Sequence, residues 1–175
     1  MVQANPSGKV TLGYFNLRGA TRGNVARYLL AYVGAEWDET TWLNGTGEWE
    51  KTAPTLMNFA SLPYLIDGDF KISETYAVHN YIAQKYCPEL IRETPQERAR
   101  AHQLQRLAND QLVNAKMSFF KGEIDRVGCA AKIMDGLDVV GKMLNDDRHF
   151  LMGSKPCIAD FCLMTHIDYT VHLTD

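Results

Sequence analysis

The stretch S-L-P-Y-L-I-D-G-D-F-K-I-S-E-T, residues 61–75, holds the signals that decide the fold. Two short apolar runs, 62–66 and 70–72, lie on either side of the pair Asp67-Gly68. Apolar runs joined by Asp-Gly are typical of a β-hairpin, because this pair readily adopts the backbone angles of a tight turn. The stretch therefore predicts two antiparallel strands with their turn at Asp67-Gly68.

Pro63 stands at the start of the first predicted strand, where a proline cannot donate a hydrogen bond to the sheet. A cis peptide bond before Pro63 would turn the backbone sharply and present the Leu62 N–H and C=O to an extended peptide ligand. The helix start at Ser73-Glu74-Thr75 would offer free N–H groups and hydroxyls to a carboxylate, and Glu74 could accept from an ammonium group. A trans proline in a turn and an ordinary capping cluster explain the same residues, and periodicity alone favours that simpler interpretation.

The rest of the first half alternates strand and helix patterns. In chain order these are a half-buried strand at 10–14, a break at Arg18-Gly19, a helix over 25–33 and a weaker strand at 37–42. Residues 43–61 contain two glycines and a proline and are interpreted mostly as loop, and a helix with an apolar face follows the hairpin at 77–82. The pattern predicts the order β-α-β, a long loop and β-β-α.

The second half is predicted to be helical almost throughout. Thr94-Pro95-Gln96-Glu97 is a helix-start signal, with a threonine cap, a proline in the first turn and a glutamate three residues after the cap. Apolar residues then recur every three or four positions to 119, and further helices are predicted at 124–137 and 158–165. The predicted organisation is a domain at 1–86, a linker at 87–94 and an all-helical domain at 95–175.

Composition limits the classes of function. The 175 residues are 46% apolar, which suits one large or two small folded domains, and the net charge of −3 gives no electrostatic reason to bind nucleic acid. No apolar run is long enough to span a membrane, and the N-terminus lacks a signal-peptide pattern. Four cysteines without a C-x-x-C pair are expected to be free thiols in a reducing compartment, so a cytoplasmic location is predicted.

No metal is predicted. His166, Asp168 and His172 lie near one another in the sequence, but no other residues support a ligand spacing. They are interpreted as groups on a helix surface. The chain also lacks the glycine patterns of phosphate and dinucleotide sites.

Six segments resemble, in the right order, the cytosolic glutathione transferases, most of all the mu class and then the sigma class. They are L-G-Y-F-N-L-R-G (12–19), L-P-Y-L-I-D-G (62–68), K-I-S-E-T-Y-A-V (71–78), H-N-Y-I-A-Q-K-Y (79–86), R-A-R-A-H-Q-L-Q-R-L-A-N-D-Q (98–111) and G-S-K-P-C-I-A-D-F (153–161). The resemblance implies an α/β plus all-α fold. In it a thioredoxin-like β-α-β-α-β-β-α domain binds glutathione and precedes an all-helical domain that is shorter at its C-terminus than in the family.

The resemblance also implies a reaction: attack of the glutathione thiolate on small apolar electrophiles, a detoxification chemistry, by a homodimer with glutathione as co-substrate. Two alternatives stay open. One is a non-catalytic subunit of this fold within a larger assembly of other chains, which the short C-terminal region favours. The other is a sigma-like prostaglandin isomerase that shares the glutathione site.

Tyr14 is the catalytic residue that the resemblance implies, with its hydroxyl donating to the glutathione sulfur. A thiol of pKa ~8.5 is only a few per cent thiolate at neutral pH, and the thiolate is the nucleophile. Lowering that pKa by about 2 requires about 2.7 kcal/mol of preferential stabilisation of the anion. One neutral donor to a charged acceptor supplies roughly 1.5–3 kcal/mol, so one tyrosine could account for most of the effect.

The other site residues follow from the resemblance as well. Trp49 and Lys51 are expected to hold the glycyl carboxylate of glutathione. Leu62, with Pro63 in cis, is expected to pair with the cysteinyl backbone. Glu74 and Thr75 are expected to bind the γ-glutamyl end.

The resemblance implies roles for three further residues, two at a dimer interface and one at the electrophile site. Asp110 matches an aspartate that reaches the γ-glutamyl amine across a dimer interface. Phe59 matches an aromatic residue that inserts into the second copy of the dimer. Phe120 stands where mu enzymes often carry a tyrosine over the electrophile, and its missing hydroxyl could narrow the range of electrophiles.

Overall fold

The structure is a computed structural model, and it describes residues 9–17, 21–142, 144 and 148–174, without the side chains at 111, 112 and 169–174. The chain folds as two compact units, Met1–Pro88 and Glu89–Asp175, and each is described by itself. The finer division into 1–86, 87–94 and 95–175 stays a prediction. The predicted break at Arg18-Gly19 lies outside the described residues.

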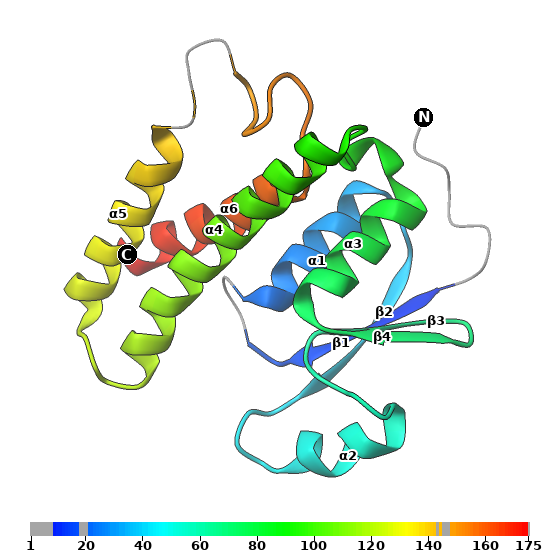
Figure 1. Cartoon of the computed structure of the whole chain (residues 1–175). Coiled ribbons are helices and arrows are strands. Elements are labelled where there is room, and N and C mark those ends of the chain that lie inside the picture. The colour runs from blue at the N-terminus through cyan, green and yellow to red at the C-terminus, as the bar shows by residue number, and fades with distance from the viewer. Residues whose placement is uncertain (1–8, 18–20, 143, 145–147, 175) are drawn as a thin grey trace. The chain divides into compact units, whose positions relative to one another are not determined.

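The first unit is built around a four-stranded sheet in the order β2-β1-β3-β4 (Figure 1). Its strands and helices are β1 (Val10–Phe15), α1 (Arg22–Tyr32), β2 (Trp37–Trp42), α2 (Glu48–Leu56), β3 (Tyr64–Asp67), β4 (Phe70–Ser73) and α3 (Thr75–Tyr86). Strand β1 runs parallel to β2 and antiparallel to β3, and β3 pairs antiparallel with β4. This β-α-β-α-β-β-α order confirms the thioredoxin-like architecture.

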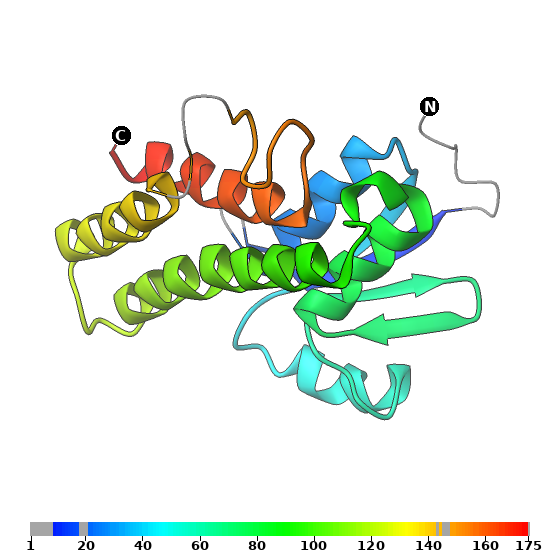
Figure 2. The ribbon, with the colours of Figure 1, turned by 45° about the horizontal axis from the view of Figure 1, so that its top comes forward.

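The sheet is covered on both faces, with α1 and α3 on one side and α2 on the other (Figures 1 and 2). Strand β1 fits between them because two glycines admit aromatic rings. A Cβ at Gly23 of α1 would lie 2.6 Å from Cγ of Tyr14, and a Cβ at Gly13 would lie 2.1 Å from Cε1 of Tyr64. Gly13 is buried, so the expectation that β1 is exposed on one face is wrong.

Helix α2 corrects the interpretation of residues 43–61 as mostly loop. It follows Gly47, whose φ of 75° is in the left-handed region. Glu48 and Glu50 lie in its first turn, where their negative charges interact favourably with the positive end of the helix dipole and stabilise the helix. None of its residues is fully buried, and its less exposed face is the short stripe Trp49, Thr52, Ala53 and Leu56. Gly45, Gly47 and Pro54 concealed this stripe, because they made the segment look like a loop.

The hairpin is confirmed, but its turn lies one residue later than predicted. Asp67 pairs with Phe70 as the last residue of β3, so the turn residues are Gly68 and Asp69. Gly68 has a φ of 59°, which a glycine adopts without steric penalty.

The second unit is helical, with α4 (Pro95–Phe120), α5 (Arg126–Gly141) and α6 (Ile158–Thr174); a short 3₁₀ helix, η1 (Pro88–Leu90), lies at its start. The predicted start signal of α4 is confirmed as a full capping box. The Glu97 N–H donates to Thr94 Oγ1 over 3.2 Å, and the Thr94 N–H donates to Glu97 Oε2 over 3.1 Å. Helix α6 continues to Thr174, well beyond the predicted 165.

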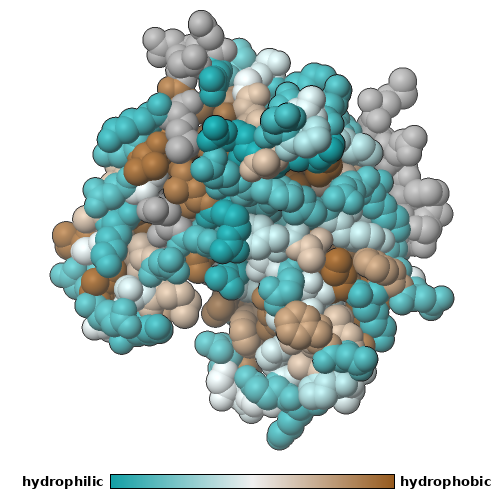
Figure 3. Space-filling view, in the orientation of Figure 1, coloured by the Kyte–Doolittle hydropathy of each residue, from teal (hydrophilic) through white to brown (hydrophobic). Residues whose placement is uncertain are grey.

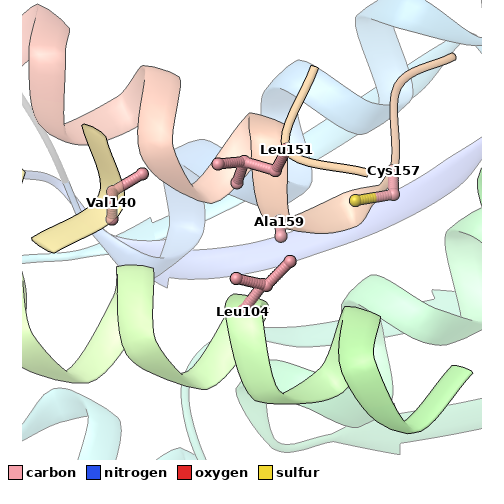
Figure 4. Packing of buried hydrophobic residues seen from close by; sticks show 5 residues of the cluster. All are labelled: Leu104, Val140, Leu151, Cys157 and Ala159. Carbon is pink, nitrogen blue, oxygen red and sulfur yellow. The ribbon is translucent and has the colours of Figure 1, made fainter. Parts of the chain in front are cut away.

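One core cluster of the helical unit lies where α4, α5, α6 and the segment before α6 meet (Figure 4). Its buried members are Leu104, Val140, Leu151, Cys157 and Ala159, and a second cluster contains Ala115, Cys129 and Ile133. The four cysteines are all buried and free, which confirms the expectation of free thiols. Burial raises the pKa of the Cys157 thiol to about 11, so it is a packing residue rather than a nucleophile at neutral pH.

His166 was expected on a helix surface, and this is wrong. Its side chain is 1% exposed, and its Nδ1 lies 2.9 Å from Nζ of the buried Lys116. Burial lowers the pKa of His166 to about 3 and that of Lys116 to about 7. Asp168 is exposed, and the side chain of His172 lies outside those that the structure describes.

The surface carries both polar and apolar side chains (Figure 3). Large apolar side chains that are at least half exposed include Val127 and Met134 of α5. Within the described residues, no helix is long and apolar enough to cross a membrane.

Candidate functional site

The predicted site residues of the first unit gather at one end of its sheet. Gly13 pairs with Tyr64, and Tyr64 pairs with Ser73. Continuing both registers by one residue brings Tyr14, Pro63 and Glu74 to the same level across β1, β3 and the end of β4. Three segments far apart in the sequence thus supply neighbouring backbone and side-chain groups.

Tyr14 of β1 contacts the first turn of α1, because its ring lies against Gly23. Tyr14 is 8% exposed, and burial raises the pKa of its hydroxyl. Arg22 and Thr21, at the start of α1, oppose that increase. The phenol therefore keeps its proton at neutral pH and can donate it in a hydrogen bond.

The Leu62–Pro63 peptide bond is cis, which confirms the prediction from the sequence. Pro63 is buried and Leu62 is partly exposed. Leu62 precedes the paired part of β3, so its backbone N–H and C=O lie outside the ladder between β1 and β4. These are the groups that an extended peptide can pair with.

Glu74 has a φ of 79° and is the one described non-glycine residue with a positive φ. Such a conformation costs about 1–3 kcal/mol and persists where the surroundings enforce it. Here Ser61 does so twice: its hydroxyl donates to Glu74 Oε1 over 2.5 Å and accepts from the Glu74 N–H over 3.1 Å. The turn at Glu74 leads directly into Thr75, the buried first residue of α3.

Trp49 is held by an aromatic cluster that sequence reasoning missed. Its ring stacks on Tyr64 with centroids 5.9 Å apart and meets Trp42 edge-on at 5.1 Å. Each such contact contributes about 0.5–1.5 kcal/mol beyond burial, so the partly exposed indole has a fixed position. The clue in the sequence was an aromatic residue on each of three neighbouring elements.

Lys51 lies on α2 only two residues after Trp49, and it is exposed. Residues two apart on a helix point in different directions. The structure therefore places Lys51 and Trp49 on different faces of α2, and the expectation that both hold the glycyl carboxylate stays a prediction.

The remaining predicted residues are described within their own units. Phe59 lies between α2 and β3, is 69% exposed, and its carbonyl accepts from the Ser73 hydroxyl over 2.7 Å. Asp110 of α4 forms an ion pair of 2.7 Å with Arg106. Phe120 is the last residue of α4 and is 68% exposed.

A buried carboxylate, that of Asp67, connects the hairpin to α3 through hydrogen bonds and an ion pair. Asp67 accepts hydrogen bonds from the hydroxyls of Tyr81, at 3.0 Å, and Tyr86, at 2.7 Å, and pairs with Lys85. Burial opposes the charged form of Asp67, but the hydrogen bonds from these three residues outweigh it and lower its pKa. The sequence suggested only a turn residue here.

Comparison with known proteins gives the family. The model of the glutathione S-transferase N-terminal domain matches residues 10–84. The class-mu 26 kDa glutathione S-transferase isozyme 51 of Fasciola hepatica is 30% identical over 164 residues, which cover 90% of this chain and 72% of that protein. This chain belongs to the glutathione S-transferase family. Glutathione S-transferase Mu 2 of Mus musculus is also similar, at 27% identity over 93% of this chain and 73% of the relative, so the likeness is to the mu class.

Solved structures of glutathione S-transferases share the fold. The Pi-class enzyme of Onchocerca volvulus has a TM-score of 0.80 at 20% identity, covering 95% of this chain and 79% of that one. The Nu-class enzyme of Haemonchus contortus has a TM-score of 0.67 at 21% identity, covering 88% and 77%. The fold of this chain thus agrees with the architecture predicted from its sequence.

Proposed function

We propose that the chain is an active transferase that joins the glutathione thiolate to small apolar electrophiles. The observation that carries the proposal is Tyr14, whose hydroxyl keeps its proton and lies on β1 at the level of Pro63 and Glu74. A phenolic proton donated to sulfur stabilises the thiolate relative to the thiol and so raises the fraction of nucleophile.

The same end of the sheet offers partners for the rest of the tripeptide. The backbone of Leu62 can pair with the cysteinyl residue, and the first N–H groups of α3, with Glu74 and Thr75, can bind the γ-glutamyl end. Trp49 offers an indole N–H to the glycyl end. Lys51 has a weaker claim, because it does not share the face of Trp49.

The first test compares the wild type with Tyr14→Phe. We expect the variant to be retained on immobilised glutathione with nearly unchanged affinity, since the peptide ends of the ligand carry the binding. Its turnover should fall about 10- to 100-fold, because one hydrogen bond to an anion is lost. The pKa of the bound thiol, measured by ultraviolet titration, should rise.

Tyr32→Phe is the matched control, since Tyr32 is a helix-surface tyrosine that is 45% exposed. It should leave both the turnover and the pKa of the bound thiol unchanged. A wild type that does not bind glutathione would overturn the proposal. Binding without turnover would favour a non-catalytic subunit, and an unchanged thiol pKa in Tyr14→Phe would remove Tyr14 from its role.

A further inference from the structure

A histidine lies in the buried stripe of α3, where aliphatic side chains would be expected. The buried residues of α3 are Thr75, Val78, His79, Ile82, Ala83 and Tyr86. His79 is 0% exposed, and burial lowers its pKa to about 4, so the imidazole is neutral at pH 7. A neutral imidazole has one donor nitrogen and one acceptor nitrogen.

The donor of His79 has a definite target. Its Nε2 lies 3.2 Å from the backbone carbonyl oxygen of Arg22, the first residue of α1. Because a carbonyl oxygen can only accept, Nε2 carries the proton. This leaves Nδ1 as a buried acceptor without a hydrogen-bond partner among the residues that the structure describes.

A buried polar atom without a partner is unfavourable, and an aliphatic side chain at this position would avoid that penalty. The one hydrogen bond that His79 makes, to the start of α1, is therefore the feature that distinguishes it from an aliphatic residue. It connects α3 to α1 across 57 residues of sequence.

The start of α1 in turn contacts Tyr14. A Cβ at Gly23 would lie 2.6 Å from Cγ of the Tyr14 ring, so the first turn of α1 packs directly against that ring. Arg22, the residue before Gly23, opposes the rise in the pKa of the Tyr14 hydroxyl that burial causes. The first turn of α1 thus sets both the position of the ring and the surroundings of its hydroxyl.

We propose that His79 is a positioning residue for Tyr14: its Nε2–H holds the first turn of α1 so that Gly23 stays packed against the Tyr14 ring and Arg22 keeps its place beside it. The consequence for catalysis rests on the proposed role of Tyr14 in transfer. The link from His79 through Arg22 to Tyr14 is a property of the folded unit and can be measured without glutathione.

Two amide variants form a matched test. In His79→Gln the side-chain NH₂ can take the place of Nε2 and still donate to the Arg22 carbonyl. In His79→Asn the NH₂ lies near the position of Nδ1 and cannot reach that carbonyl. Both variants bury an amide of similar polarity, so they differ mainly in this one hydrogen bond. Thermal unfolding of both gives their loss of stability.

The main readout is the pKa of the Tyr14 hydroxyl, followed by NMR of protein labelled at tyrosine Cζ and assigned with Tyr14→Phe. It should rise in His79→Asn, where the first turn of α1 with Arg22 is no longer held, and stay near the wild-type value in His79→Gln. Turnover with saturating glutathione should fall about tenfold in His79→Asn, the effect of losing one hydrogen bond of ordinary strength, and recover in His79→Gln.

A matched packing control is Ile82→Val, one turn further along the same buried stripe, which should lower stability without changing the Tyr14 pKa. Equal Tyr14 pKa values in wild type and a folded His79→Asn would overturn the proposal, whatever the turnover. If neither amide variant folds, ¹⁵N NMR of the wild type decides, because a His79 protonated on Nδ1 instead of Nε2 would also overturn it. A wild type without transferase activity would refute the proposed function, and the Tyr14 pKa would still test this link.

Discussion

Gly23 is the point at which the first turn of α1 meets the ring of Tyr14. A Cβ placed there would lie 2.6 Å from Cγ and 2.7 Å from Cδ1 of that ring. Real Cβ atoms do not approach so closely, so a side chain at position 23 must displace either the ring or the helix. The position of the Tyr14 ring thus depends on a residue that carries no functional group.

We predict that Gly23→Ala moves the Tyr14 ring and destabilises the protein by about 1–3 kcal/mol, the usual effect of overpacking a core. Denaturant unfolding would measure the loss of stability, and turnover should fall as the hydroxyl leaves its position. Gly141→Ala is the control, because Gly141 ends α5 and no described atom outside its chain neighbours and the nearby helix backbone lies within 4 Å of the place that a methyl group would take. That substitution should be neutral or slightly stabilising, since alanine favours helix. Equal stability in the two variants would contradict the close packing at Gly23.

At the scale of elements, the hairpin and α3 are joined by a carboxylate. Asp67 ends β3 and accepts from Tyr81, Lys85 and Tyr86, one face of the last two turns of α3. Hydrogen bonds to a charged group are the stronger kind, at about 1.5–3 kcal/mol each when their partners are shielded from water. Because Lys85 is one-third exposed, its share is smaller than that of the tyrosines.

We predict that Asp67→Asn lowers the free energy of unfolding by about 2 kcal/mol at pH 7. The folded state lowers the pKa of Asp67, so its contribution is present above the unfolded pKa and is lost as the pH falls through the folded pKa. The difference between wild type and variant in urea unfolding should therefore shrink below about pH 4. Asp69→Asn, in the exposed turn two residues later, is the control and should have little effect at either pH. A constant difference down to pH 2 would contradict the role of the charge.

How far the sequence predicted each element depended on whether its local signals agree. Helix α4 was predicted because a capping box and an apolar stripe coincide. Helix α2 was missed because Gly47 and Pro54 are typical of a loop, although Trp49, Ala53 and Leu56 recur at helical spacing. The hairpin turn was misplaced by one residue because Asp67, which looks like a turn residue, is instead the last residue of β3 and the acceptor of three side chains.

Some residues of the candidate site were likewise predicted from the sequence, and others were missed. Tyr14, Pro63 and Glu74 were identified through resemblance to a family, and local patterns alone favoured simpler interpretations. His79 was missed because one polar residue in an apolar stripe does not disturb the helical period. The signal in the sequence is the histidine itself, because it occupies a position of the buried stripe where an aliphatic residue would be expected. Its target, the Arg22 carbonyl, depends on tertiary structure and could not be read from either segment.

At the scale of the whole molecule, Phe59 stands out as the most exposed large apolar side chain among the described residues of the first unit. It is 69% exposed, yet its backbone is fixed, because the Ser73 hydroxyl donates to its carbonyl over 2.7 Å. A large aromatic side chain presented on a fixed loop is typical of an interface anchor. The expectation of a homodimer in which Phe59 inserts into the second copy therefore stays our proposal.

We predict that Phe59→Ser shifts the protein from dimer to monomer, because a desolvated aromatic anchor typically contributes about 2 kcal/mol or more to an interface. Light scattering over a range of concentrations would measure the mass of wild type and variant. Phe70→Ser is the control: Phe70 is 46% exposed, and its ring stacks on Tyr81 of its own unit with centroids 4.7 Å apart. That variant should lose thermal stability and keep its mass. If Asp110 of one copy serves the glutathione site of the other, Phe59→Ser should also weaken glutathione binding in proportion to the monomer formed. A wild type that is monomeric at every concentration would refute the role of Phe59, and a wild type found only with unrelated chains would favour the subunit of a larger assembly.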